Sequence, residues 1–345
     1  MSRSAQKECT WSPWHERLHK ALLNKANLIP QGSSVLIAVS GGQDSMALLK
    51  LIHDLRRLHN WDIKVWHGDH HWHNKSSEYA IGVKEWCETR KIDCYLDQAE
   101  KEQAKNEKEA RDWRYQCLKD RVKTWANSKK ESNFFYVLTA HTSTDRVETF
   151  LINLARGSNL AGLVSLNESR KLAENIQLTR PFLMFSREET FQICQQFNLP
   201  IWIDPSNEKL ELTRNRVRKI ILPELNNLYK GCELRISELI STLLHYKDSQ
   251  KALTLLALEG IEEHSKRKIC RKKVSLLPIS ARATLFECWL RKEGVPSITS
   301  NQLKEISYRV QVGQPPGIKS LPKNWKLEWC KSYINLIEEN ETSSY

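Results

Sequence analysis

The stretch Ser34-Val35-Leu36-Ile37-Ala38-Val39-Ser40-Gly41-Gly42-Gln43-Asp44-Ser45 decides the fold of this chain. Its first half, residues 34–39, is apolar on both faces, which is typical of a strand buried on both sides in a parallel sheet covered by helices. Apolar residues then recur at helical spacing over residues 46–55. A strand, a glycine turn and a helix in this order open a β-α-β unit.

The same alternation continues downstream. We expect strands at residues 63–67, 94–96 and 134–140, and helices at residues 77–90, 107–126 and 145–156. Strands alternating with helices of about ten residues or more predict a doubly wound α/β fold with a mostly parallel sheet. After Asp204-Pro205 the signal is helical to about residue 312, with one long helix over residues 231–259, and residues 325–337 are typical of a short β segment.

These shifts in pattern divide the chain into four expected parts. They are an N-terminal extension with a helix (residues 1–29), the α/β domain (30–212), a helical region (213–312), and a small C-terminal α+β tail domain made of a short β segment and tail (313–345).

The composition sets broad limits. Lys and Arg number 53 against 41 Asp and Glu, so the net charge of +12 is compatible with a polyanionic partner. No stretch approaches the roughly 18 apolar residues of a membrane span, and the N-terminus lacks the apolar core of a secretory signal. The nine cysteines include no C-x-x-C pair, which disfavours a disulfide framework or a thiolate metal site and favours a reducing cytoplasm.

The glycine turn at residues 40–45 has the features of a phosphate site. Two glycines let the backbone approach a phosphate, with the N–H groups of the following helix aimed at it. Ser40 and Ser45 add hydroxyl groups, whereas the Asp44 carboxylate would repel a phosphate unless Mg²⁺ bridged the two. The G-x-G-x-x-G and G-x-x-x-x-G-K-[ST] patterns are absent. An ordinary strand-to-helix turn remains the alternative for the bare spacing.

Asp145 and Glu148 form a second candidate site. Their spacing places both on one face of a helix, with about 5–6 Å between Cβ atoms. The strand before them ends at the same edge of the sheet as the strand before Ser40, so the pair should lie near the glycine turn. Two carboxylates could hold an ammonium group or remove its proton. The alternative is that they complement the dipole of a helix N-terminus.

Basic residues gather at two places. Arg214, Arg216 and Arg218 follow a turn and could clamp a phosphate or form a solvated face. Six of the eight residues from 266 to 273 are basic, which suits contact with an RNA backbone or a solvated surface: Lys266, Arg267, Lys268, Arg271, Lys272 and Lys273. A histidine group at residues 67–73 lacks a matching distal Cys or His motif, so packing or nucleotide contact is favoured there over a metal.

Several motifs together resemble a known family. Residues 40–45 resemble the S-G-G-x-D-S loop of PP-loop ATP pyrophosphatases, which cleave ATP between the α and β phosphates. Ala140-His141 with Asp145-Arg146-Val147-Glu148-Thr149, and then Arg156-Gly157-Ser158-Asn159, are similar to the A-H-x-x-x-D-Q-x-E-T and R-G-S-G motifs of tRNA(Ile)-lysidine synthetases. Further matches in the family's order are Glu109-Ala110-Arg111 with Arg114-Tyr115, Arg180-Pro181, Asp204-Pro205-Ser206-Asn207, Arg214-Asn215-Arg216-Val217-Arg218 and Leu222-Pro223-Glu224-Leu225.

The sequence departs from the family pattern at three places. Arg146 stands where the family has Gln, and His70-His71-Trp72 stands where N-H-G-L is typical. Asn159 replaces a Gly, and we expect the turn to survive because Asn tolerates a positive φ.

The resemblance implies a reaction. ATP would adenylate the C2 carbonyl of the wobble cytidine in a CAU-anticodon isoleucine tRNA, and the ε-amine of free lysine would then displace AMP to give lysidine. The implied cofactor set is ATP as substrate with Mg²⁺, and the chain would be a cytoplasmic monomer or homodimer. The rival readings are a PP-loop tRNA thiolase, which usually carries cysteine motifs, and an inactive RNA-binding protein.

The resemblance also assigns residues. The implied catalytic residues are Asp44, Asp145, Glu148 and Arg214, with Asp145 and Glu148 binding lysine and Asp44 holding Mg²⁺ through ATP. The implied ATP-binding residues are Ser40, Gly41, Gly42, Gln43, Asp44 and Ser45. The residues expected to contact tRNA are Arg114, Arg216, Arg218, Lys266, Arg267, Lys268, Arg271, Lys272 and Lys273.

Overall fold

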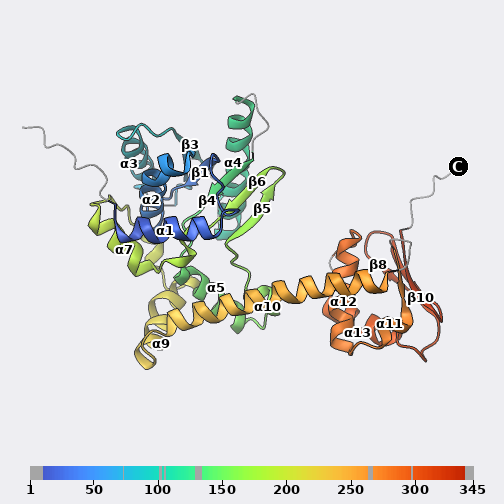
Figure 1. The fold of residues 1–345 in the computed structure, drawn as a ribbon. Helices are drawn as coiled ribbons and strands as arrows, with labels where there is room; N and C mark the ends of the chain where they lie inside the picture. Colours follow the sequence, from blue (N-terminus) through green and yellow to red (C-terminus); the bar gives the residue numbers. More distant parts are fainter. Residues whose placement is uncertain are drawn as a thin grey trace, which may run out of the picture. The chain divides into compact units, whose positions relative to one another are not determined.

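The computed structural model describes residues 11–72, 74–100, 103–104, 106–128, 134–262, 267–296 and 298–338, without the side chains of residues 206 and 207. The chain divides into two compact units, Met1–Ser241 and Thr242–Tyr345 (Figure 1). The boundaries of the four expected parts remain predictions.

A six-stranded sheet forms the centre of the first unit. Its order is β3-β2-β1-β4-β6-β5, and every neighbouring pair is parallel except β5 with β6. The strands are β1 (Ser34–Ala38), β2 (Asp62–Asp69), β3 (Cys94–Gln98), β4 (Phe135–Leu138), β5 (Ser169–Ala173) and β6 (Ile176–Thr179). This confirms the doubly wound, mostly parallel fold. The antiparallel hairpin of β5 and β6 was not expected, because its strands are short and carry polar residues.

Helices cover both faces of this sheet. Val35 and Ile37 of β1 face a core shared with α1 (Pro13–Asn24), α2 (Gln43–His59), α3 (Ser76–Glu88) and α7 (Arg187–Gln196). Leu36 faces the opposite core, which includes Leu118 and Val122 of α4 (Glu107–Ser128). Residues 34–37 are therefore apolar without alternation because both faces of β1 are buried.

The segments after β4 and β6 are mostly helical. They comprise α5 (Ser143–Ala155), α6 (Leu160–Leu163), the 3₁₀ turns Pro181–Met184 and Pro205–Glu208, α8 (Thr213–Arg216), a π-helical turn at Val217–Ile221, α9 (Leu222–Leu228) and α10 (Cys232–Ile261). The single long helix expected at residues 231–259 is confirmed as α10. In the described parts of the chain, no helix is both long enough and apolar enough to cross a bilayer.

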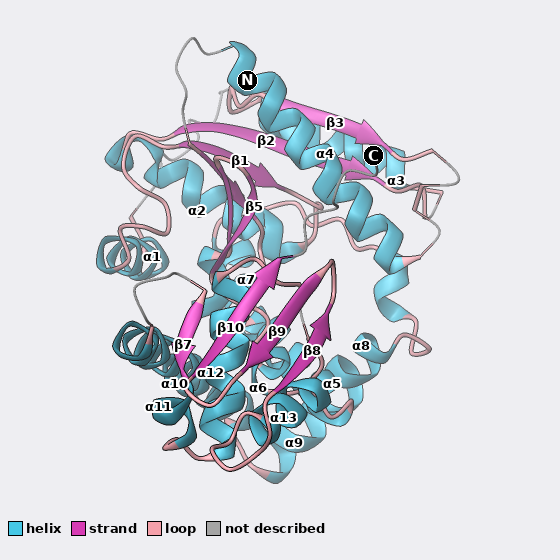
Figure 2. Ribbon diagram, turned by 90° about the vertical axis from the view of Figure 1, so that its right-hand side faces the viewer, coloured by secondary structure: helices cyan, strands magenta, loops and turns pink. Residues whose placement is uncertain are grey.

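The second unit is a small α+β structure. An antiparallel sheet of order β7-β10-β9-β8 packs with helices α11 (Arg271–Ser275), α12 (Ile279–Lys292) and α13 (Ser300–Arg309) (Figure 2). Its strands are β7 (Lys268–Cys270), β8 (Gly317–Leu321), β9 (Trp325–Trp329) and β10 (Tyr333–Glu338). The β segment expected at residues 325–337 thus forms the two central strands of a larger sheet.

Arg271 is a structural residue of this unit. Its side chain is almost fully buried, and its guanidinium donates hydrogen bonds of 2.7 Å to four backbone carbonyl oxygens, those of Val310, Gln311, Gln314 and Cys330. The expectation that Arg271 contacts RNA is therefore withdrawn, because its N–H groups already bind the fold.

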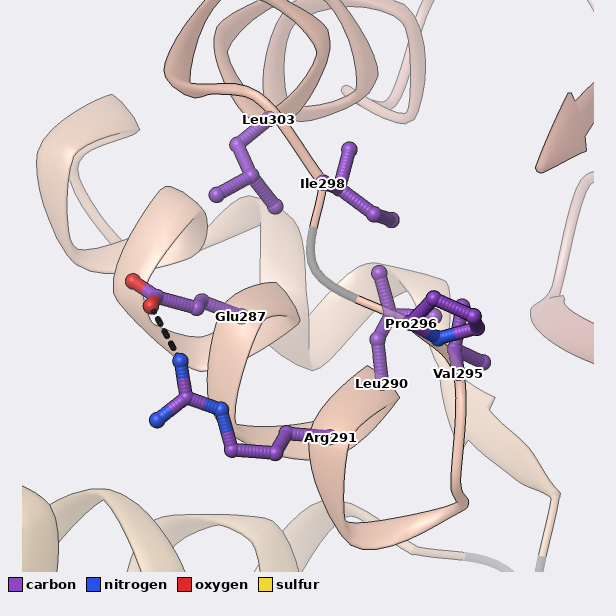
Figure 3. A pocket seen from close by; sticks show the side chains of 7 residues that line it. All are labelled: Glu287, Leu290, Arg291, Val295, Pro296, Ile298 and Leu303. Carbon is purple, nitrogen blue, oxygen red and sulfur yellow. Dashed lines mark hydrogen bonds and ion pairs between the residues drawn. The ribbon is translucent and has the colours of Figure 1, made fainter. Parts of the chain in front are cut away.

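A hollow between α12 and α13 is too small for a substrate. Its volume is about 30 Å³, which suits about one water molecule. Apolar side chains including Leu290 and Leu303 line it, and an ion pair of Glu287 with Arg291 lies at its edge (Figure 3).

Candidate active site

The glycine turn presents the N-terminus of α2. Gly41 has φ +85°, and a Cβ there would lie 3.2 Å from the Trp202 ring, so both backbone conformation and space favour glycine. Gly42 is the N-cap of α2, where no side-chain hydrogen bond caps the helix. The Ser45 hydroxyl accepts from Ser40 N–H at 3.2 Å and lies 2.9 Å from the Gly42 carbonyl. Backbone N–H groups at such a turn suit a phosphate.

Gln43 contributes to this turn through its backbone. Its side-chain amide donates to the carbonyl of Arg187 at 2.7 Å and to the Thr190 hydroxyl at 3.0 Å. The side chain therefore fastens α2 to α7, and we retain Gln43 as an ATP-binding candidate only for its N–H group.

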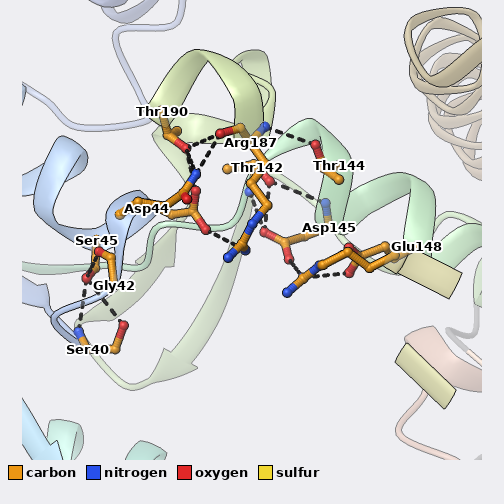
Figure 4. Close-up of polar contacts among 12 residues, drawn as sticks. Ser40, Gly42, Asp44, Ser45, Thr142, Thr144, Asp145, Glu148, Arg187 and Thr190 are labelled. Atoms are coloured by element: carbon orange, nitrogen blue, oxygen red, sulfur yellow. Dashed lines mark hydrogen bonds and ion pairs between the residues drawn. The ribbon is translucent and has the colours of Figure 1, made fainter. Parts of the chain in front are cut away.

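Asp44 lies in a strongly polar corner between α2 and α7. One carboxylate oxygen accepts from Arg187 Nη1 at 3.0 Å and the other accepts from the Thr190 hydroxyl (Figure 4). Burial raises the pKa of Asp44, Arg187 opposes that shift, and the nearby charge of Asp145 adds to it. A cation would favour the ionised form of this carboxylate.

The donor set at Asp44 fits Mg²⁺. Mg²⁺ prefers oxygen ligands and is commonly held by one or two carboxylates together with substrate phosphates. No group of three or more His, Cys, Asp or Glu residues arranged to hold a metal occurs in the described part of the chain. Asp44 beside a phosphate-binding turn therefore suits a cation that arrives with a nucleotide.

The second carboxylate site lies at the start of α5. Thr142 is the N-cap, and Asp145 Oδ2 accepts from its N–H at 2.8 Å and from its hydroxyl at 3.0 Å. Asp145 Oδ1 accepts from Arg214 Nη2 at 2.8 Å and from Arg218 Nη2 at 3.1 Å. The capping box thus fixes one oxygen of Asp145 and leaves the other facing the arginines.

Glu148 shares the same two arginines. It is fully buried, and it accepts from Arg214 Nε at 2.8 Å, Arg218 Nη2 at 2.9 Å and Arg218 Nε at 2.5 Å. Burial would raise the pKa of Asp145, but Arg214, Arg218 and the backbone hydrogen bond from Thr142 outweigh it and lower that pKa. Two carboxylates, labelled in Figure 4, and the guanidinium groups of Arg214 and Arg218 therefore form one charge-balanced cluster.

The three arginines at residues 214–218 have different environments. Arg214 and Arg218 are four residues apart and both reach the carboxylate pair, whereas Arg216 is exposed. Arg218 was expected at the tRNA surface, but the structure places it beside Arg214. Helix periodicity separates these residues, although the sequence presents them as one basic row.

His141 joins this cluster to further arginines. Its Nδ1 lies 3.0 Å from the Thr139 hydroxyl. Burial lowers the pKa of His141 to about 3, and Arg180, Arg214 and Arg114 add to the effect although Asp145 opposes it. His141 is therefore neutral near pH 7. Arg114, expected to contact tRNA, lies half-buried in this charged group.

Four residues of this site were not identified from the sequence. Arg187 and Thr190 bind Asp44, and Trp202 packs on the glycine turn and donates its backbone N–H to the Gly41 carbonyl at 3.0 Å. Glu233 of α10 accepts from the Thr144 hydroxyl at 2.5 Å. Only chain folding brings these residues to the site, and none stands in a motif of recognisable spacing.

The departures from the family pattern have clear structural settings. Asn159 has φ −68° and caps α6, accepting from Gly162 N–H at 3.0 Å, so the expected positive φ is wrong; Gly157 has it instead, at +70°. Arg146 is buried, with one hydrogen bond of 3.5 Å to the Ser241 hydroxyl. His70 is partly buried against Trp113, at 4.8 Å between ring centroids.

The basic run at residues 266–273 is dispersed. Lys266 and His73 lie outside the described residues. Arg267 pairs with Glu338 at 3.1 Å, and the Lys268 ammonium lies 3.8 Å from the centroid of the Tyr333 ring. Lys272 and Lys273 are exposed, and Lys273 reaches the Gly260 carbonyl at 2.8 Å.

The glycine turn at the end of β1 and the ligand edge of the parallel sheet define an ATP-binding protein of the PP-loop class. In agreement, a family profile described as a PP-loop domain matches residues 13–225.

Comparison with curated proteins narrows the class. The chain is 44% identical over 337 residues to a tRNA(Ile)-lysidine synthase from a strain of Prochlorococcus marinus, covering 98% of this chain and 100% of that protein. It is 34% identical to the enzyme of that name from a strain of Synechococcus sp., covering 91% and 93%. A chloroplastic enzyme of that name from Pyropia yezoensis is 36% identical, covering 71% and 74%. The chain belongs to the tRNA(Ile)-lysidine synthase family.

Proposed function

We propose that this chain uses ATP to join free lysine to C2 of the wobble cytidine in a CAU-anticodon isoleucine tRNA, forming lysidine and releasing AMP and pyrophosphate. The chain is an ATP-dependent ligase of tRNA modification, in keeping with relatives of nearly the same length that are named tRNA(Ile)-lysidine synthase. The observation that carries the finer proposal is the proximity of the two sites: Arg187 donates from its side chain to Asp44 at 3.0 Å and from its backbone N–H to the hydroxyl of Thr144, the neighbour of Asp145, at 3.0 Å (Figure 4). An activated base held at one site is thus within reach of an amine held at the other.

The first half-reaction is adenylation. The C2 carbonyl oxygen of cytidine attacks the α-phosphorus of ATP, and pyrophosphate leaves. The N–H groups at the start of α2 hold phosphate oxygens, while the hydroxyls of Ser40 and Ser45 define the turn. Mg²⁺, held by Asp44 and the phosphates, would offset negative charge on the leaving group. The base must leave the anticodon stack, at a cost of a few kcal/mol.

The second half-reaction is attack by lysine. The ε-amine adds to C2, and AMP leaves with the oxygen that C2 carried. The amine must first lose a proton. We assign its binding to the carboxylate pair and its deprotonation to Glu148, because Arg214 and Arg218 lower the pKa of Asp145 against the effect of burial. Neutral His141, whose pKa is about 3, cannot take that proton near pH 7.

The hydrogen bonds of the pair separate the roles of its two members. A carboxylate offers about four acceptor positions. Asp145 uses four of them on Thr142, Arg214 and Arg218. Glu148, although fully buried, accepts three hydrogen bonds from described residues, and these leave one acceptor position at Oε1 unused. We therefore assign the direct contact to Glu148, and assign to Asp145 the positioning of the arginines.

The tRNA contacts belong to the same proposal. We retain Arg114 near the site and exposed Arg216, together with Lys266, Arg267, Lys268, Lys272 and Lys273, because each cation paired with a phosphate releases counterions. Eight cysteines of the described residues are free thiols, in keeping with our proposal of a cytoplasmic location.

The test is mass spectrometry of a CAU-anticodon tRNA after incubation with the protein, ATP, Mg²⁺ and isotope-labelled lysine. We expect the label at the wobble cytidine and the release of one AMP and one pyrophosphate per modified tRNA. A tRNA that gains sulfur instead would favour a thiolase. No lysine-dependent mass change from a folded protein would refute the proposal.

A further inference from the structure

A cluster of arginines surrounds Tyr115 on the α4 side of the sheet. The guanidinium of Arg170 lies 4.7 Å from the centroid of the Tyr115 ring, and that of Arg111 lies 5.5 Å from it. Arg170 and Arg180 both act electrostatically on the phenol group. The cluster therefore joins α4, β5 and the residue after β6, and Figure 1 shows α4, β5 and β6 as neighbours.

The side chains of the cluster range from exposed to almost fully buried. Arg111 and Arg170 are exposed, Arg114 and Tyr115 are half-buried, and Arg180 is only 2% exposed. Arg180 donates to the Asn167 carbonyl at 2.6 Å, but its buried Nε has no partner among the described residues. A buried guanidinium with an unused N–H is costly unless an anion completes its bonding.

The charge around Tyr115 is strongly positive. Burial alone would raise the pKa of Tyr115, yet Arg111, Arg170 and Arg180 lower it. Burial lowers the pKa of Arg180, and Arg170 and Arg111 act in the same direction. Guanidinium groups gathered at this spacing repel one another, so the fold holds them together at a cost that a bound anion would offset.

The cluster continues toward the proposed catalytic residues. Arg114 and Arg180 both act on His141, which in turn interacts with Asp145. The electrostatic reach of the cluster therefore extends to the carboxylate pair.

We infer that the group formed by Arg111, Tyr115, Arg170 and Arg180 binds a backbone phosphate of the anticodon loop beside the cytidine that reacts. The inference rests on the proposed function, and it names an RNA contact that was not expected from the sequence.

The place of the group in the sheet favours RNA over the nucleotide. In the order β1-β4-β6-β5, the strand that carries Arg170 is three positions from the strand that leads into the glycine turn. Strands lie about 4.8 Å apart, so the lateral offset is about 14 Å. Arg170 is thus remote from the phosphate seat at α2, whereas an RNA loop is large enough to span both places.

Arg170→Gln tests the inference, with Lys171→Gln as its matched control. Arg170 pairs with Leu178, which is buried in the core under α4, and Lys171 pairs with Gln177, so adjacent side chains of β5 leave on opposite faces. Both residues are exposed and both variants remove one positive charge. Thermal melting should show that both variants remain folded.

The measurement is binding of CAU-anticodon tRNA without ATP or lysine, over a series of salt concentrations. Loss of one phosphate contact should reduce the slope of log K against log salt by about 1. We expect that change for Arg170→Gln and for Arg111→Gln, and none for Lys171→Gln. Tyr115→Phe removes no charge and should keep the wild-type slope. The KM for ATP should stay unchanged in all four.

Two results would overturn the inference. One is a slope for Arg170→Gln equal to that of Lys171→Gln. The other is a raised KM for ATP with unchanged tRNA binding, which would assign the cluster to the nucleotide. Either can occur while the wild type forms lysidine, whereas failure of the wild type to modify tRNA would refute the proposed function itself.

Discussion

Glu148→Gln should separate the two half-reactions. Glutamine keeps the size of the side chain and one acceptor oxygen, but it removes the charge that attracts an ammonium group. Adenylation requires only ATP, the cation and the cytidine carbonyl. We therefore expect adenylated tRNA to accumulate in single-turnover reactions, while the apparent KM for lysine rises.

The magnitude follows from the contacts of Glu148. A hydrogen bond to a charged group contributes about 1.5–3 kcal/mol, which corresponds to roughly a 10- to 100-fold rise in the KM for lysine. The substitution also leaves Arg214 and Arg218 facing one carboxylate. Breaking a buried pair costs about 3–5 kcal/mol, and we expect about 3 because the Arg214 side chain is 30% exposed. The variant should therefore still fold, with a lower melting temperature.

Asp145→Asn is the matched comparison. Protein donors already use four acceptor positions of Asp145, so this variant should change the KM for lysine less than Glu148→Gln does. The double variant should lose less than the sum of the two, because both residues hold the same arginines. The assay is quenched-flow separation of unmodified, adenylated and lysine-bearing tRNA. If Glu148→Gln blocks adenylation while the lysine dependence stays normal, Glu148 serves the nucleotide site and the assignment is refuted.

Four further outcomes are expected. Asp44→Asn should reduce ATP–pyrophosphate exchange by on the order of 100-fold or more without a change in circular dichroism, and undiminished exchange would remove Asp44 from the mechanism. Arg146→Gln should raise the free energy of unfolding in urea by about 1 kcal/mol, because it removes a buried and poorly hydrogen-bonded charge from the first turn of α5. A free energy of unfolding below that of the wild type would show that Arg146 has a partner in solution. Arg271→Gln should lower the free energy of unfolding by about 3 kcal/mol or more, because backbone carbonyls that Arg271 binds lose their hydrogen-bond donor. Lys272→Gln, at an exposed position, should have almost no effect. Folding lowers the pKa of Asp145, so the ionised carboxylate stabilises the fold at pH values above its unfolded-state pKa of 3.8. This contribution is lost as the pH falls below 3.8. Acid melting should therefore be steeper in the wild type than in Asp145→Asn.

The sequence by itself determined the first strand of the sheet, the glycine turn and the helix that follows it. The apolar run of β1, the glycines at 41 and 42 and the periodicity of α2 are local features, since each depends on neighbours in the chain. The spacing of Asp145 and Glu148 likewise places both on one side of α5, as the shared arginines show. Short or polar strands, such as β5 and β7, escaped prediction because their pairing partners, not their own pattern, make them strands.

Tertiary structure decided which residues, distant in the sequence, contact these local features. Arg187 reaches Asp44 across 143 positions of sequence, and Arg214 reaches Glu148 across 66. It also gave the basic residues different environments. Arg218 binds a buried carboxylate and Arg271 binds backbone carbonyls, whereas Arg170, which belongs to no recognised motif, lies in the cluster at Tyr115. The physical reason is that the sequence shows which side chains are charged but not what surrounds them in the fold. Whether such a side chain binds a solvent ion, a carbonyl or a carboxylate depends on burial and on the partners that folding places within hydrogen-bond distance.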